Sequence, residues 1–211
     1  MKNTLGIELT DHQRTQLDVL EREALAFNTK LNLYSKTSAE DFRLRHLAHS
    51  LTLASRPFSP GSVVADWGTG GGMPGLVLAI VFPEVAFHLI DSVGKKIRAV
   101  QAMARRVGLG NVEAHHTRAE EWAGRATHSV SRATAPLDTL WTWHTRVAAP
   151  MKSSGDDWEP GLLCLKGGDL RSEIADLKAI DADVRVTTTP VRTWLDDPYF
   201  EDKVLVQVTR S

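Results

Sequence analysis

The stretch Val63-Val64-Ala65-Asp66-Trp67-Gly68-Thr69-Gly70-Gly71-Gly72-Met73-Pro74-Gly75 decides the fold of this chain. Short apolar residues lead into an acidic residue and a glycine-rich turn, and the apolar run 76–82 follows. This order predicts a buried strand, a tight loop and a helix. Glycines let the main chain approach a ligand, and a helix start offers free N–H groups and a positive dipole end. The sequence therefore predicts a ligand site where this strand ends.

Two ligands suit such a loop. Segment 70–75 satisfies the dinucleotide pattern G-x-G-x-x-G, and Asp91 follows it by about 20 residues. An acid just before the first glycine, as Asp66 stands before Gly68, is instead typical of S-adenosylmethionine-dependent methyltransferases. Both acids are expected at the rim formed by the carboxyl ends of parallel strands, where a carboxylate can accept hydrogen bonds from a ribose diol. The glycines alone leave both ligands open.

The composition limits the class of protein. The 211 residues carry a net charge of −1, so one domain is expected, and a nucleic-acid partner would need a local basic patch. Cys164 is the one cysteine, which excludes an internal disulfide and a zinc cluster of several thiolates, and we expect no metal site. The N-terminus is polar, and no apolar run approaches the roughly 20 residues of a membrane span. We expect a cytoplasmic monomer.

Helices and strands alternate along the chain after a helical beginning. Capping signals at Thr10 and Ser38 open two helices, the second ending near Arg56, which predicts a helical extension over 1–56 and a ligand-binding domain over 57–211. Later strands are predicted over 85–91, 111–115, 128–133, 162–166, 184–186 and 203–208. The last two have no helix between them, which favours antiparallel pairing. This predicts an α/β, Rossmann-like, seven-stranded S-adenosylmethionine-dependent methyltransferase fold with an N-terminal helical extension.

Further motifs are more specific than the glycine loop. They are Asn32-Leu33-x-Ser35, Arg45-His46-x-x-x-Ser50, Asp66-x-Gly68-Thr69-Gly70-x-Gly72-x-Pro74-Gly75, Leu89-Ile90-Asp91-Ser92-x-Gly94-Lys95-Lys96, Arg118-Ala119-Glu120-Glu121, Ser131-Arg132-Ala133 and Leu165-Lys166-Gly167. Together they resemble the bacterial small-subunit ribosomal RNA N7-guanine methyltransferase family, also called the glucose-inhibited division protein B family. The chain departs from that family's usual residues at Tyr34, His49, Trp67, Gly71 and Met73.

The resemblance implies a substrate, a cofactor and a set of contacts. It implies methyl transfer from S-adenosylmethionine to N7 of a guanine in the 530 loop of 16S ribosomal RNA, within the small ribosomal subunit. It also implies that the cofactor is lined by Gly68, Met73, Ala119, Glu120 and Arg132. The loop and strand patterns described above add Gly70, Gly72 and Asp91.

Basic residues are the candidates for contacts with RNA, because Lys and Arg neutralise phosphates. Those we single out are Arg45, His46, Lys95, Lys96 and Lys166. Lys95 and Lys96 belong to a predicted helix over 94–107 that carries no acidic residue. Tyr34 is a candidate for stacking on a splayed base.

The expected chemistry requires positioning alone. N7 of guanine has an in-plane lone pair and no proton to lose, so no catalytic residue is expected. Cys164 lies in an apolar strand and is expected to be structural. Two alternatives remain open: a methyltransferase of the same fold acting on another RNA or a small molecule, and a nucleotide-binding protein without transfer activity, in which Trp67 or Met73 crowds the pocket.

Overall fold

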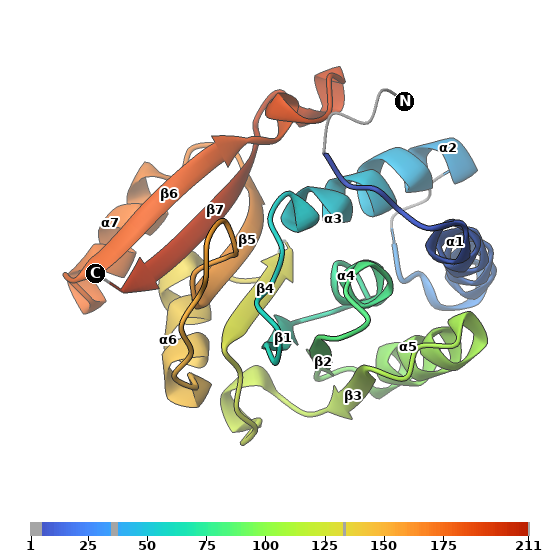
Figure 1. Cartoon of the computed structure of the whole chain (residues 1–211), viewed down its shortest axis with the longest axis horizontal. Coiled ribbons are helices and arrows are strands. Elements are labelled where there is room, and N and C mark those ends of the chain that lie inside the picture. The colour runs from blue at the N-terminus through green and yellow to red at the C-terminus, as the bar shows by residue number, and fades with distance from the viewer. Residues whose placement is uncertain (1–5, 35–37, 133, 211) are drawn as a thin grey trace.

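A seven-stranded sheet forms the centre of the molecule (Figure 1). The computed structural model describes residues 6–34, 38–132 and 134–210. The sheet order is β3-β2-β1-β4-β5-β7-β6. The strands are β1 (Val63–Trp67), β2 (Ala86–Asp91), β3 (Val112–His116), β4 (His128–Arg132), β5 (Gly161–Gly167), β6 (Val184–Pro190) and β7 (Lys203–Arg210).

Strand direction separates this sheet from a dinucleotide-binding domain. Strands β1 to β5 pair in parallel, whereas β7 is antiparallel to both β5 and β6. A dinucleotide-binding sheet has six parallel strands in the order 3-2-1-4-5-6. The predicted seven-stranded methyltransferase sheet is therefore confirmed, including its antiparallel final pair.

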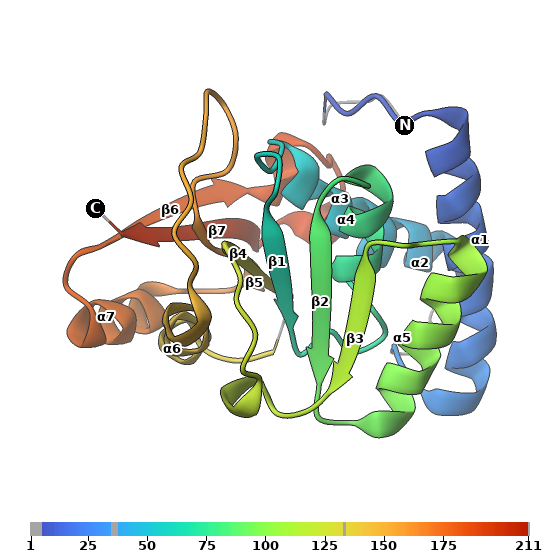
Figure 2. The ribbon, with the colours of Figure 1, turned by 60° about the horizontal axis from the view of Figure 1, so that its bottom comes forward.

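Helices cover both faces of the sheet and give two apolar cores (Figures 1 and 2). On one face lie α1 (Asp11–Leu31), α4 (Gly75–Val81) and α5 (Gly94–Val107), and on the other lie α6 (Leu137–Val147) and α7 (Arg171–Ile180). The capping box predicted at the start of α1 is present, since Thr10 and Gln13 bond reciprocally. The Gln13 side chain also donates to the carbonyls of Ile80 and Val81, which ties α1 to the end of α4.

The second predicted helix of the N-terminal extension is helical but not uniformly α-helical. It consists of α2 (Ala39–Phe42), the π-helical segment η1 (Arg43–Ala48), α3 (His49–Leu51) and the 3₁₀ turn η2 (Thr52–Ala54). A π-helix fits one extra residue into a turn, and such segments are frequent at functional sites. In the part of the chain that the structure describes, no helix has the length and apolar character that crossing a membrane requires.

Candidate functional site

Asp66 organises the glycine loop from inside the protein. Its carboxylate is fully buried and accepts hydrogen bonds from the Thr69 hydroxyl at 2.6 Å and the Gly75 amide at 3.0 Å. Burial raises the pKa of Asp66 to about 7. The expectation that Asp66 would lie at the ligand rim is therefore wrong, because the loop folds back over its side chain.

Asp91 holds the place at the rim that the sequence predicts. One carboxylate oxygen accepts a hydrogen bond from the Gly70 amide at 3.0 Å and the other from the Val93 amide at 2.8 Å. The Lys96 ammonium lies 3.7 Å from the first oxygen. Each carboxylate oxygen has two lone pairs, so further acceptor capacity remains for a ligand.

A cavity of about 580 Å³ opens beside this loop. Seven of the eight residues predicted to hold the cofactor line it: Gly68, Gly70, Met73, Asp91, Ala119, Glu120 and Arg132. Gly72 is not among the described residues that line the cavity; with φ at +93°, it lets the loop pack closely against Leu76. Pattern reasoning did not single out Leu33, Thr134 or Trp143, which also line this cavity.

Tyr34 supports the loop rather than a substrate. Its ring is buried, and its hydroxyl donates a hydrogen bond to the Gly71 carbonyl. Phe42 packs edge-on against the ring at 5.1 Å between centroids. Burial raises the pKa of Tyr34. A buried and hydrogen-bonded ring has little surface for stacking on a splayed RNA base, and Tyr34 lines the first cavity, not the second.

A second cavity of about 560 Å³ shares Arg132 with the first. The Arg132 guanidinium donates to the Arg45 carbonyl at 3.0 Å and to Nδ1 of His46 at 2.8 Å. Burial, Arg132 and Arg45 together lower the pKa of His46 to about 3, so this imidazole is a neutral acceptor. These two fixed hydrogen-bond acceptors of η1 thus offset the free-energy cost of burying the Arg132 guanidinium.

His49 is a polar group of the second cavity that sequence reasoning noticed only as a departure from the family pattern. It is 4% exposed, and its Nε2 has no hydrogen-bond partner among the residues described. Burial lowers the pKa of His49 to about 3. A buried nitrogen without a hydrogen-bond partner costs free energy, which the rest of the fold has to offset.

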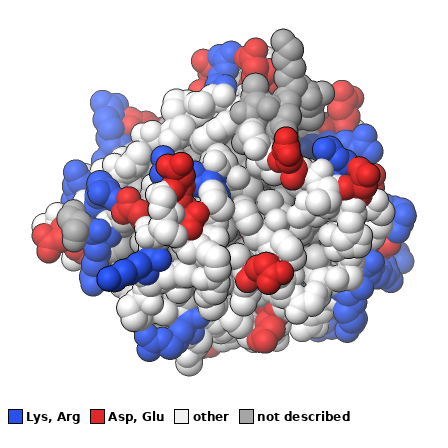
Figure 3. All heavy atoms as spheres, viewed as in Figure 1, with Lys and Arg blue, Asp and Glu red and all other residues white. Residues whose placement is uncertain are grey.

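The five basic candidates for RNA contacts divide between three places. Arg45, His46 and Lys166 line the second cavity, where Lys166 also donates to Glu173 at 2.7 Å. Lys96 lines the first cavity instead, and Lys95 is exposed on α5 and is absent from the described lining of either cavity. In the view of Figure 3, basic side chains gather at the right-hand edge, over α1 and α5. The sequence did not single out Tyr199 or Lys203, which complete the second cavity.

Two further expectations concern residues away from the cavities. Trp67 is fully buried and packs edge-on against Trp122 and Trp143, at 5.6 and 6.1 Å between ring centroids. It is not among the described residues lining the first cavity, so the idea that Trp67 crowds the ligand is wrong. Cys164 is buried in β5, and burial raises its pKa to about 12, which agrees with a structural thiol. Ser35 and Ala133, which belong to two of the family motifs, lie outside the described residues.

Solved structures with the same fold are methyltransferases of several kinds. Magnesium protoporphyrin IX methyltransferase from Synechocystis PCC 6803, solved with bound S-adenosylmethionine, matches with a TM-score of 0.59 at 13% identity over 96% of this chain and 98% of that one. A SAM-dependent methyltransferase from Aquifex aeolicus matches with a TM-score of 0.58 at 18% identity over 81% of this chain and 93% of its own. At these identities the likeness shows the fold, and it agrees with the sheet topology.

Sequence comparison identifies the family. The family model GidB, rRNA small subunit methyltransferase G, matches residues 13–185. The ribosomal RNA small subunit methyltransferase G of Salinibacter ruber is 50% identical over 202 residues, which cover 95% of this chain and 94% of that protein. The protein of the same name from Chlorobaculum tepidum is 40% identical over 95% of this chain and 91% of its own. The resemblance seen in the motifs is confirmed, and the chain belongs to the rRNA small subunit methyltransferase G family.

Proposed function

We propose that this protein transfers the methyl group of S-adenosylmethionine to N7 of a guanine in the 530 loop of 16S ribosomal RNA. Membership of the family supports methyl transfer to RNA of the small subunit. The observation that carries the proposal is that Arg132 lines both cavities. A donor held in the first cavity and a base held in the second would meet at this side chain.

The residues of the first cavity fit the cofactor. A volume of about 580 Å³ falls within the range of small-molecule sites, about 300–1,000 Å³. Gly70 leaves room for close approach, because a Cβ added there would meet only the Gly68 carbonyl, at 3.8 Å. Asp91 offers fixed acceptors for ribose hydroxyls, and Met73 and Ala119 give apolar walls. When bound, the cofactor supplies an electrophilic methyl group on a sulfonium.

The second cavity suits a nucleotide that needs only to be held in place. N7 of guanine can attack through its lone pair without losing a proton, so the site requires alignment rather than a general base. Arg45, Lys166 and Lys203 offer cationic donors to phosphate or to guanine O6.

Methyl transfer to small ribosomal subunits tests this proposal. The purified protein would be incubated with S-adenosylmethionine labelled in its methyl group and with subunits that lack the modification. N7-methylguanine is then located by borohydride reduction and aniline cleavage of the RNA. We expect one cleavage site, in the 530 loop, and no label with Asp91→Asn at a cofactor concentration that saturates the wild type.

Two results would overturn the proposal at different levels. Label on another nucleotide or another RNA would keep the enzyme class and replace the substrate. Saturable cofactor binding without transfer to any RNA would favour the alternative of a binding protein without transfer activity.

A further inference from the structure

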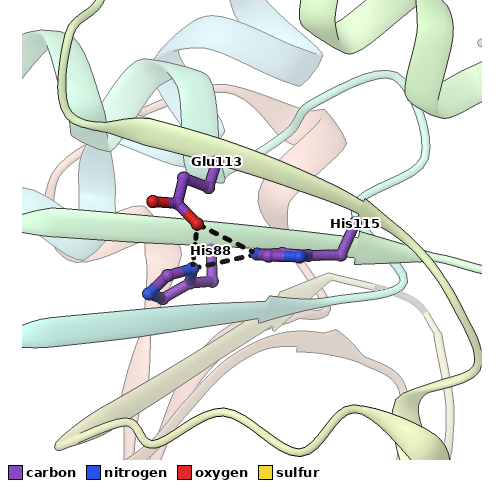
Figure 4. Close-up of side chains that lie close together, drawn as sticks. All are labelled: His88, Glu113 and His115. Carbon is purple, nitrogen blue, oxygen red and sulfur yellow. Dashed lines mark hydrogen bonds and ion pairs between the residues drawn. The ribbon is translucent and has the colours of Figure 1, made fainter.

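Three side chains of metal-binding chemistry meet on the face of β2 and β3 that carries the second apolar core. His88 of β2 is paired in register with Glu113 of β3, and His115 lies two residues beyond Glu113. Side chains alternate across a strand, so residues i and i+2 share a face with the partner of residue i. Figure 4 shows the three side chains pointing toward one another from the two strands.

The spacing of their ligand atoms matches one face of a coordination tetrahedron. Nδ1 of His88 lies 3.0 Å from Nε2 of His115. The Glu113 carboxylate oxygen lies 3.6 Å from the first nitrogen and 3.8 Å from the second. Zinc bonds of about 2.0–2.1 Å in a tetrahedron place ligand atoms about 3.3 Å apart. Movements of a few tenths of an ångström would therefore bring all three atoms to one ion.

The surroundings restrict the movement of the two imidazoles and leave the carboxylate open to solvent. The Trp122 ring packs against both histidines, at centroid distances of 5.2 and 5.7 Å. Glu113 is the exposed member, with 72% of its side chain accessible, which leaves a path for an ion and for water.

We propose that His88, Glu113 and His115 bind one divalent transition-metal ion, for which Zn²⁺ has the best matching ligand set and geometry. Two imidazoles and one carboxylate leave a fourth position open to water. None of the three is among the described residues that line the first cavity, so the ion is separate from the proposed methyl transfer. The ion would join edge strand β3 to β2 beside Trp122, which lies two residues after Glu120 of the first cavity.

This site departs from the expectation of no metal. That expectation rests on the single cysteine, whereas Glu113 and His115 lie 25 and 27 residues after His88, a separation that matches no short metal-binding motif. Only the register of two neighbouring parallel strands brings them together.

Titration of the whole protein with Zn²⁺ tests the site. After chelator treatment and buffer exchange, we expect one equivalent of Zn²⁺ to bind with a dissociation constant of about 1 μM or tighter by calorimetry. Co²⁺ in its place should give the visible absorption of a four-coordinate ion. Glu113→Gln should weaken Zn²⁺ binding about tenfold or more, and His88→Gln combined with His115→Gln should abolish it.

His116→Gln is the matched control. His116 is the next residue of β3, and its Nε2 contacts the Ser92 carbonyl instead of the cluster. The His116→Gln variant should bind Zn²⁺ as the wild type does. Zn²⁺ should raise the melting temperature of both, but not that of the variant that combines His88→Gln with His115→Gln. The proposal is overturned if the double histidine variant, folded by circular dichroism, retains the binding, or if the wild type binds no more tightly than that variant.

Discussion

Gly71 shows how a single residue couples the N-terminal extension to the ligand loop. A Cβ at this position would lie 2.3 Å from Cζ of Tyr34, whose hydroxyl bonds the Gly71 carbonyl. The Tyr34 ring is itself fixed by Phe42 and His46. We expect Gly71→Ala to lower the free energy of unfolding by about 1–3 kcal/mol through overpacking. We also expect a cofactor affinity about tenfold weaker, measured by calorimetry.

Gly110→Ala is the matched control for this change. A Cβ at Gly110 meets no atom within 4 Å, and the residue is remote from the cavity. Its stability and cofactor affinity should equal those of the wild type. Equal cofactor affinity in Gly71→Ala and the wild type would show that Tyr34 does not position the loop.

Residue-level prediction succeeded where the function of a side chain follows from its place in a strand. Asp91 ends β2, so its position at the rim follows from the parallel sheet. The predictions for Tyr34 and Asp66 failed because both side chains bond to groups of the folded loop, the Gly71 carbonyl for Tyr34 and the Thr69 hydroxyl and Gly75 amide for Asp66, which no spacing reveals. His49 gave no signal of its unpartnered nitrogen, since that depends on packing around Phe200.

At the scale of elements, the π-helical segment η1 is the main difference from the sequence-based prediction. The apolar periodicity of residues 38–56 predicts an ordinary helix, and one extra residue in a turn leaves that pattern almost unchanged. The segment nevertheless presents the Arg45 carbonyl and His46 Nδ1 to Arg132 together. These contacts with Arg132 are tertiary, so the local sequence pattern does not reveal them.

Helix α5 is the element for which RNA binding can be tested by charge alone. Arg106 is paired with Glu23 of α1 and Lys96 faces Asp91, whereas Lys95 and Arg98 are exposed. We expect Lys95→Gln with Arg98→Gln to weaken binding to small ribosomal subunits. The plot of log affinity against log salt concentration should become less steep, by about one to two units of slope, because each phosphate contact contributes roughly one. Cofactor affinity should not change.

The matched control also removes two positive charges, but at the other end of the strands, where β4 and β5 begin. Arg125 and Lys152 precede the start of β4 and β5, away from the carboxyl ends of these strands. Arg125→Gln with Lys152→Gln should leave subunit binding and its salt slope unchanged. An equal loss in both double variants would mean that net charge, rather than α5, governs the affinity.

At the scale of the whole molecule, buried neutral histidines make stability depend on pH. Burial lowers the pKa of His128 and His144 to about 4, from an ordinary value near 6.5. Between these values the unfolded chain binds protons that the folded protein does not, so the free energy of unfolding falls as the pH falls from about 6.5 towards 4.

The variant His144→Gln removes the contribution of one histidine to this pH dependence, so that the contribution can be measured. Nδ1 of His144 lies 2.9 Å from the Ser129 hydroxyl, a contact that an amide can replace. From urea unfolding at pH 5 to 6.5, the slope of the free energy of unfolding against pH should be smaller than that of the wild type by about 1 kcal/mol per pH unit. An unchanged slope would mean that His144 is protonated in the folded protein.

The number of strands and the antiparallel final pair were predictable because they follow from the count and alternation of elements. Helices connect the parallel strands, and no helix separates β6 from β7. These two features restrict the possible topologies to a few, and the structure has the predicted seven strands. The second cavity was not predictable in the same way, because η1, β5 and β7 bring its residues together from distant parts of the chain.

The most direct test of the two-cavity account is single-turnover methyl transfer by Arg132→Lys on small ribosomal subunits. Lysine keeps the charge but cannot bond the Arg45 carbonyl and His46 with one planar fork. We predict that cofactor affinity stays within about threefold of the wild type while the transfer rate falls about 100-fold, because alignment between the cavities is lost. An unchanged rate in this variant, with an unchanged melting temperature, would contradict the role of Arg132 as the link between cofactor and base.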